Sequence, residues 1–93
     1  MCGPRGCAAH GTSGAITWGS SGNLRGETHD DGLGGTIARF DAYRDGALLR
    51  SFTQRLDEGT RSYTLPIGAA DRVKIRVCNA SAPTTCNSRT YRR

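Results

Sequence analysis

The chain has few of the residues that build a large core. Leucine, isoleucine, valine and phenylalanine together make 14 of its 93 residues, and its formal net charge is +5. That composition by itself is typical of disordered chains. No apolar run is long enough to span a bilayer, so we expect no membrane insertion. One folded domain is the most that this length and this apolar content can support.

The sequence also lacks the repeat of apolar residues that marks a helix, and it has only three prolines. It does contain a stretch in which apolar and polar residues alternate strictly. Val73, Ile75 and Val77 are separated by basic residues and share one face of an extended chain. This pattern predicts a half-buried strand over residues 71–78. Thirteen glycines fit short strands joined by tight turns.

Residues 36–44 and 47–53 form the clearest predicted hairpin. Asp45-Gly46 between them is a typical two-residue turn, because both central positions of such a turn need a positive φ. Counting outward from this turn predicts Ala42 opposite Leu49 and Asp41 opposite Arg50.

Further short strands are predicted at residues 15–18, 24–28 and 63–67, and residues 87–92 can add a final strand. Six to seven strands with regularly spaced turns indicate an all-β, immunoglobulin-like antiparallel sandwich. We expect residues 1–13 to form an N-terminal arm and residues 14–93 to form the sandwich domain. The predicted core is Ile16, Trp18, Phe40, Leu49, Tyr63, Leu65, Val73, Ile75 and Val77.

The four cysteines lie in two close pairs. In a small chain with a sparse core this arrangement predicts two disulfides and therefore an oxidising, extracellular location. Three pairings are possible. We favour Cys2–Cys7 with Cys78–Cys86, because each bond then closes a short loop, and a cross-pairing of the two ends is the alternative.

The first of these loops is Cys2-Gly3-Pro4-Arg5-Gly6-Cys7. Closed by a disulfide, it is expected to present Arg5 on a rigid ring, with Pro4 and Gly6 beside it as partner-binding residues. Such an arginine suits an acidic or trypsin-like pocket, as an inhibitor or as an anchor. Replacement of Arg5 by alanine should then weaken binding without changing the melting temperature. The alternative is a terminal clip that only protects the chain end.

No set of residues forms a recognised catalytic or metal-binding motif. Arg25, Glu27 and His29 resemble the residues of small ribonucleases, but without a known spacing they are more simply a solvent face. Cys2, Cys7 and His10 match no common zinc module. The turn Asp30-Asp31-Gly32 lacks the spaced carboxylates of a calcium loop. We therefore expect no enzyme activity, no metal and no cofactor.

The strand at residues 71–78 carries Arg72, Lys74 and Arg76 on its polar face. Together with a sequence pI near 9.5, this face favours an anionic partner. Aromatic residues that could stack on bases are few and are needed for the core, so no specific nucleic-acid binding is expected. Lys74 and Arg76 are the partner-binding residues predicted here.

Short motifs link the chain to a known group. They are Ile16-Thr17-Trp18, Asn23-Leu24-Arg25-Gly26, Asp31-Gly32, and residues 73–78 followed by a short loop to Cys86. Over residues 14 to 87 the chain resembles small secreted, disulfide-bearing β-sandwich proteins of actinomycetes, among them the adaptor subunit of umbrella toxin particles. The resemblance implies a non-enzymatic adaptor between a lectin-like subunit of degenerate trypsin fold and a toxin subunit. It also implies that residues 1–13 insert into the trypsin-like cleft.

These observations together predict a secreted, non-catalytic module that binds other secreted proteins. The arm around Arg5 is the first expected contact, and an exposed strand edge is the second, since unpaired edges accept added strands. A protease inhibitor presenting Arg5 is one alternative function. A small cationic antimicrobial toxin or nuclease is the other.

Overall fold

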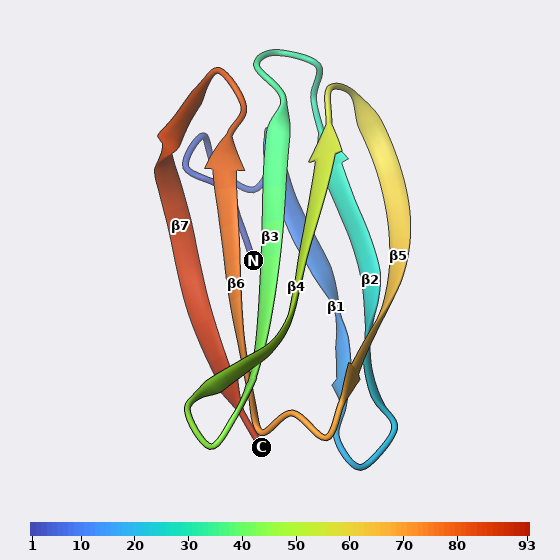
Figure 1. Ribbon diagram of the computed structural model, residues 1–93. Helices are drawn as coiled ribbons and strands as arrows, with labels where there is room; N and C mark the ends of the chain where they lie inside the picture. Colours follow the sequence, from blue (N-terminus) through green and yellow to red (C-terminus); the bar gives the residue numbers. More distant parts are fainter.

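The computed structural model describes residues 1–93 and contains seven strands and no helix. Three strands form one sheet in the order β1-β2-β5, and four form the other in the order β4-β3-β6-β7. The two sheets face each other as the layers of a sandwich (Figure 1). The strands are β1 (His10–Thr17), β2 (Gly22–Asp30), β3 (Thr36–Arg44), β4 (Ala47–Leu56), β5 (Gly59–Gly68), β6 (Arg72–Asn79) and β7 (Ala82–Arg92).

All strand pairs are antiparallel, which confirms the predicted all-β sandwich. The topology is immunoglobulin-like with one change. In a constant-type immunoglobulin domain the fourth strand pairs with the fifth. Here β4 pairs with β3 and extends the other sheet, so that three strands face four. No helical segment exists that has the length and apolarity needed to cross a bilayer.

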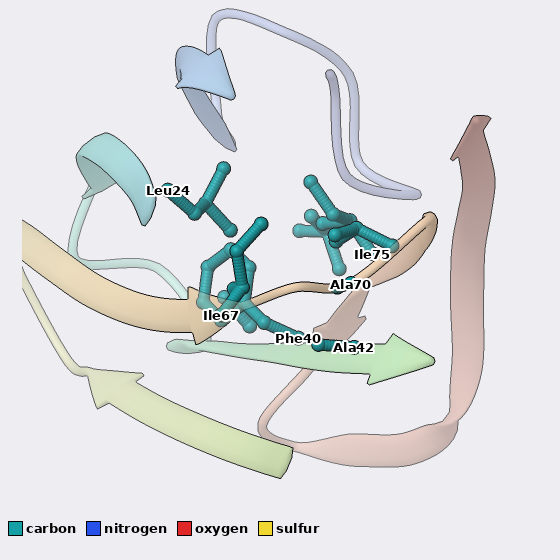
Figure 2. Close-up of a cluster of buried hydrophobic side chains, with 9 residues drawn as sticks. Leu24, Phe40, Ala42, Ile67, Ala70 and Ile75 are labelled. Carbon is teal, nitrogen blue, oxygen red and sulfur yellow. The ribbon is translucent and has the colours of Figure 1, made fainter. Parts of the chain in front are cut away.

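The core lies between the two sheets and is built by alternation. Val73, Ile75 and Val77 of β6 are all buried, as predicted. Figure 2 shows Leu24 of β2 on the other side of this cluster from Phe40 of β3. The core is small, which agrees with the low apolar content of the chain. Its members are Leu24, Ala38, Phe40, Ala42, Ile67, Ala70, Val73, Ile75 and Val77.

The hairpin of β3 and β4 forms around Asp45-Gly46 as predicted, and both turn residues have positive φ. The predicted register holds for the first two pairs only. A β-bulge between Ala42 and Tyr43 then shifts the pairing, so that Ala42 faces Arg50 and Asp41 faces Ser51. The extra residue is Leu49, which stays 46% exposed, so the prediction that it belongs to the core was wrong.

Five strands, β1, β2, β4, β5 and β7, are longer than the sequence suggested, and two of the extensions change expected boundaries. β1 begins at His10, so the expected boundary between an arm ending at residue 13 and a domain starting at residue 14 falls inside this strand. β7 begins at Ala82, which pairs with Asn79, and a register irregularity then skips residues 83–85 before pairing resumes at Cys86. Neither extension shows apolar alternation in the sequence, so the local pattern does not reveal it.

Both favoured disulfides are present. Cys2–Cys7 closes the N-terminal loop, and Cys78–Cys86 joins directly opposed residues of β6 and β7. No cysteine is free. Two disulfides in so small an all-β chain are compatible with an extracellular location.

Candidate functional site

Residues 1–3 lie along the outer edge of β1 and pair with it through one isolated bridge and flanking hydrogen bonds. The Met1 amine donates to the Thr12 carbonyl at 2.6 Å, and the Thr12 amide donates back to Met1 at 2.9 Å. Cys2 bridges to Gly11, and the Gly3 amide donates to the His10 carbonyl at 3.0 Å. Residues 1–3 therefore cover the edge of β1 from His10 to Thr12 and not beyond.

Arg5 lies in a polar cluster at this end of the sandwich. Its guanidinium donates to Asp30 at 2.8 Å and to Asp31 at 2.9 Å, and its Nε donates to the Asn79 side chain at 3.2 Å. The Arg5 side chain is 23% exposed and that of Asp30 is fully buried. In Figure 1 the N-terminal loop lies beside the upper ends of β6 and β7, where Asn79 is located.

This placement differs from the one that the sequence suggested. The ring closed by Cys2–Cys7 does hold Arg5, with Pro4 half-buried and Gly6 exposed, but the guanidinium is bound to the protein's own carboxylates. Loss of Arg5 would leave the buried Asp30 carboxylate without its cation, which is costly. An unchanged melting temperature in an Arg5→Ala variant therefore no longer follows.

His10 links the loop to the core and is completely buried. The backbone N–H of Arg5 donates to its Nε2 at 3.1 Å, so Nε2 must be unprotonated. The proton then sits on Nδ1, which lies 3.0 Å from Thr36 Oγ1, and the Thr36 hydroxyl donates to Asp30 at 2.5 Å. Burial lowers the pKa of His10, and the charge of Arg5 lowers this pKa further.

The carboxylates of the Asp30-Asp31-Gly32 turn are occupied by internal donors. Asp30 also accepts the Gly32 amide, and Asp31 accepts the Leu33 amide at 2.9 Å. Hydrogen bonds from Arg5 and from the Leu33 amide hold the pKa of Asp31 below its usual value. No group of three or more histidine, cysteine or acidic side chains is placed to hold a metal ion.

The residues considered for catalysis share the outer face of β2. Arg25, Glu27 and His29 occupy alternate positions of that strand, opposite small side chains of β1 and β5. His29 Nε2 lies 2.8 Å from the Cys7 carbonyl, and no hydrogen bond or ion pair joins the three side chains. The arrangement has neither an activated nucleophile nor a paired acid and base.

The outer face of the four-stranded sheet is strongly basic. Arg76 of β6 lies opposite Arg39 of β3. Lys74 of β6 lies opposite Asp41 of β3 on one side and Thr90 of β7 on the other. Directly opposed residues of neighbouring strands share a face, so the register brings six cations together. They are Arg39, Arg55, Arg72, Lys74, Arg76 and Arg92. We call this surface the basic face.

Asp41 is the only carboxylate that the strands contribute to the basic face. It accepts hydrogen bonds from Ser51 at 2.6 Å and from Arg39 at 3.2 Å, and Arg76 lies 3.6 Å away. Burial opposes ionisation of Asp41, but these bonds outweigh it and its pKa is lowered. Asp41 therefore stays charged and fixes two of the arginines. Arg55 pairs with Asp57 beyond the end of β4 at 3.5 Å, and the remaining three cations have no carboxylate partner.

An aromatic and aliphatic patch adjoins the cations at the β3–β4 turn. The Arg72 guanidinium lies 4.2 Å from the ring centre of Tyr43, within cation–π distance. Leu48, opposite Tyr43, is 53% exposed, and its neighbour Leu49 is nearly as exposed. Arginine and tyrosine beside exposed leucine is a composition typical of protein interfaces.

A groove of about 380 Å³ opens between the edges of the two sheets, beside the uncovered half of β1. Its apolar lining comes from both sheets and from the chain ends. The residues concerned are Met1, Ile16, Trp18, Leu24, Tyr63, Ile75 and Tyr91.

Sequence reasoning placed Lys74 and Arg76 on a common basic face, and the register does so too. It missed His10, Thr36 and Asn79 as partners of the N-terminal loop. No local signal could have found them, because the contact of Arg5 with Asn79 joins residues 74 positions apart. Comparisons with protein-family models, with curated proteins and with solved structures gave no match for this chain.

Proposed function

We propose that this protein is a secreted, non-catalytic module that binds an acidic surface of another protein through its basic face. The observation that supports this function is the contrast between the two outer surfaces of the sandwich. The basic face carries six cations and one carboxylate, whereas the strands β1, β2 and β5 carry only Arg25 and Glu27 as outward charges.

A folded protein fits this surface better than a free polyanion does. The patch of Tyr43, Leu48 and Leu49 at one end of the basic face offers apolar area, which contributes affinity, while the cations supply steering and specificity. An adaptor role, as implied by the resemblance to umbrella toxin adaptors, would require a second contact elsewhere. The inhibitor alternative would require Arg5 to leave Asp30 and Asp31.

Two variants of equal net charge test the proposal. Lys74→Gln with Arg72→Gln removes two charges from the basic face, and Arg25→Gln with Arg61→Gln removes two charges elsewhere. Each is used as bait in culture fluid of the source organism, and retention of each is also measured on a poly-glutamate column. We expect the first pair to lose both the captured proteins and column retention, and the second pair to keep both. Equal behaviour of the two pairs would refute a role for the basic face.

A further inference from the structure

The three-stranded sheet is incomplete beside β1. Four strands face three, and residues 1–3 fill the position of a fourth strand along His10–Thr12 only. Beyond Thr12 the burial of β1 changes abruptly, because Ser13, Gly14 and Ala15 are all exposed. The groove lies along this uncovered half.

The hydrogen-bonding groups of this edge are defined by the register. Thr12 exchanges both of its backbone bonds with Met1, so its N–H and C=O point away from β2. The pairing of β1 with β2 has no bulge, so the alternate residues Gly14 and Ile16 point their N–H and C=O groups the same way. These groups form a free edge that continues the line of residues 1–3.

We propose that the edge of β1 at Ser13–Thr17 is a docking site for an extended segment of a partner protein. The segment adds antiparallel to β1 and completes the three-stranded sheet. It continues the pairing that residues 1–3 already make, so its residues opposite Gly14 and Ile16 hydrogen-bond to β1. The same residues point inward, as Thr12 does, toward the apolar lining formed by Trp18 and Tyr91.

Charge favours an acidic segment. Neither β1 nor β7 contains an acidic residue, and Arg92 of β7 lines the groove. A second copy of this chain would bring its own net charge of +5 to this edge, which disfavours it as the occupant. The site therefore fits a strand in which apolar residues alternate with acidic ones. Apart from Arg92, which borders both, this surface is distinct from the basic face, because it lies on the edge and not on the outside of the sandwich.

The test uses a seven-residue peptide with three valines separated by glutamates. Trp18 lines the groove and is the only tryptophan, so its fluorescence reports binding there. We expect a saturable change in emission. An Ile16→Thr variant should bind the peptide about tenfold more weakly, since the groove loses an apolar contact. Leu33→Thr, which removes a leucine that is 78% exposed and lies outside both surfaces, should leave binding unchanged.

The register provides a second, stricter test. Methylating the amide nitrogens of the three valines removes the donors that face β1 and should abolish binding. Methylating those of the glutamates changes only donors that face away and should preserve it. Equal effects of the two modifications, or no change in Trp18 emission with the parent peptide, would overturn the proposal.

Two other results would assign the surface differently. Loss of peptide binding in the Lys74→Gln, Arg72→Gln variant together with normal binding in Ile16→Thr would place the peptide on the basic face. The groove would then be rejected and the proposed function retained. A dimer that forms without peptide and is lost in Ile16→Thr would make a second copy the occupant and would also overturn the proposal.

Discussion

The two halves of β1 share one strand and one edge but have opposite surroundings. From His10 to Thr12 every residue is buried and residues 1–3 cover the edge, whereas from Ser13 to Thr17 the strand is largely exposed and the edge is bare. The covered half is held by a polar cluster, and the bare half borders an apolar groove. The comparison shows that the N-terminal loop acts as a structural part of the sheet, ending where the groove begins.

The largest expected loss of stability comes from removing Asp30, the carboxylate that anchors the covered half of β1. Asp30→Ala deletes a fully buried carboxylate, which removes the acceptor of the Thr36 hydroxyl and one of the two carboxylates that bind Arg5. We expect the free energy of unfolding to fall by about 3 kcal/mol, measured by urea denaturation. Asp57→Ala removes an exposed carboxylate paired with Arg55 and should change stability by less than about 0.5 kcal/mol. Similar losses in both variants would contradict the anchoring role of Asp30.

Opening the N-terminal ring should expose the covered edge more selectively. Replacing Cys2 and Cys7 together by serine removes a loop constraint worth about 2 kcal/mol by chain entropy. We expect the Thr12 amide, which is bonded to Met1, to exchange with solvent much faster in this variant. The Ala15 amide, which faces β2, should keep its protection and serves as the internal control. An unchanged Thr12 rate would mean that the disulfide does not hold the edge.

Lowering the pH should reduce the stability of the covered half of β1, because His10 is buried in its neutral form. Because the folded protein lowers the pKa of His10 below the usual value near 6.5, the unfolded chain binds the proton first. Stability is therefore full above about pH 6.5 and declines as the pH falls from there toward the folded pKa, by at most about 1.4 kcal/mol per pH unit. Denaturation between pH 7.5 and 5 measures this loss. His29→Gln should keep the decline, and a flat profile would contradict a neutral, buried His10. The titratable groups near His10 are Arg5, Asp30, Asp31 and His29.

The sequence was sufficient for elements that depend on local pattern. The alternation of apolar and basic residues located β6, and the Asp45-Gly46 turn located the β3–β4 hairpin. The short loops between neighbouring cysteines indicated both disulfides. Prediction failed where distant or irregular features decide the outcome. Nothing in residues 47–50 indicates the bulge that exposes Leu49. The early start of β1 is hidden because His10, Gly11 and Thr12 show no apolar alternation, and their burial depends on the N-terminal loop and on distant partners such as Thr36 and Tyr63.

The candidate surfaces were partly predictable for the same reason. Lys74 and Arg76 lie at alternating positions of one strand, so their common face follows from the sequence, but the contributions of Arg39 and Arg92 depend on strand order. The environment of Arg5 is where the structure differs most from the prediction made from the sequence. A short disulfide ring suggested exposure, whereas the carboxylates that bind Arg5 come from the turn after β2 and lie 25 and 26 positions away.

Lys74 is the only lysine of the chain, and it lies in the middle of the basic face. The Met1 amine, the other primary amine, is occupied by the Thr12 carbonyl. Amine-directed chemistry will therefore act mainly at one point. Coupling the protein to a solid support through amines would turn the basic face toward the support and hide it from partners. A lysine-reactive cross-linker would attach to Lys74 and link to whatever lies against that face.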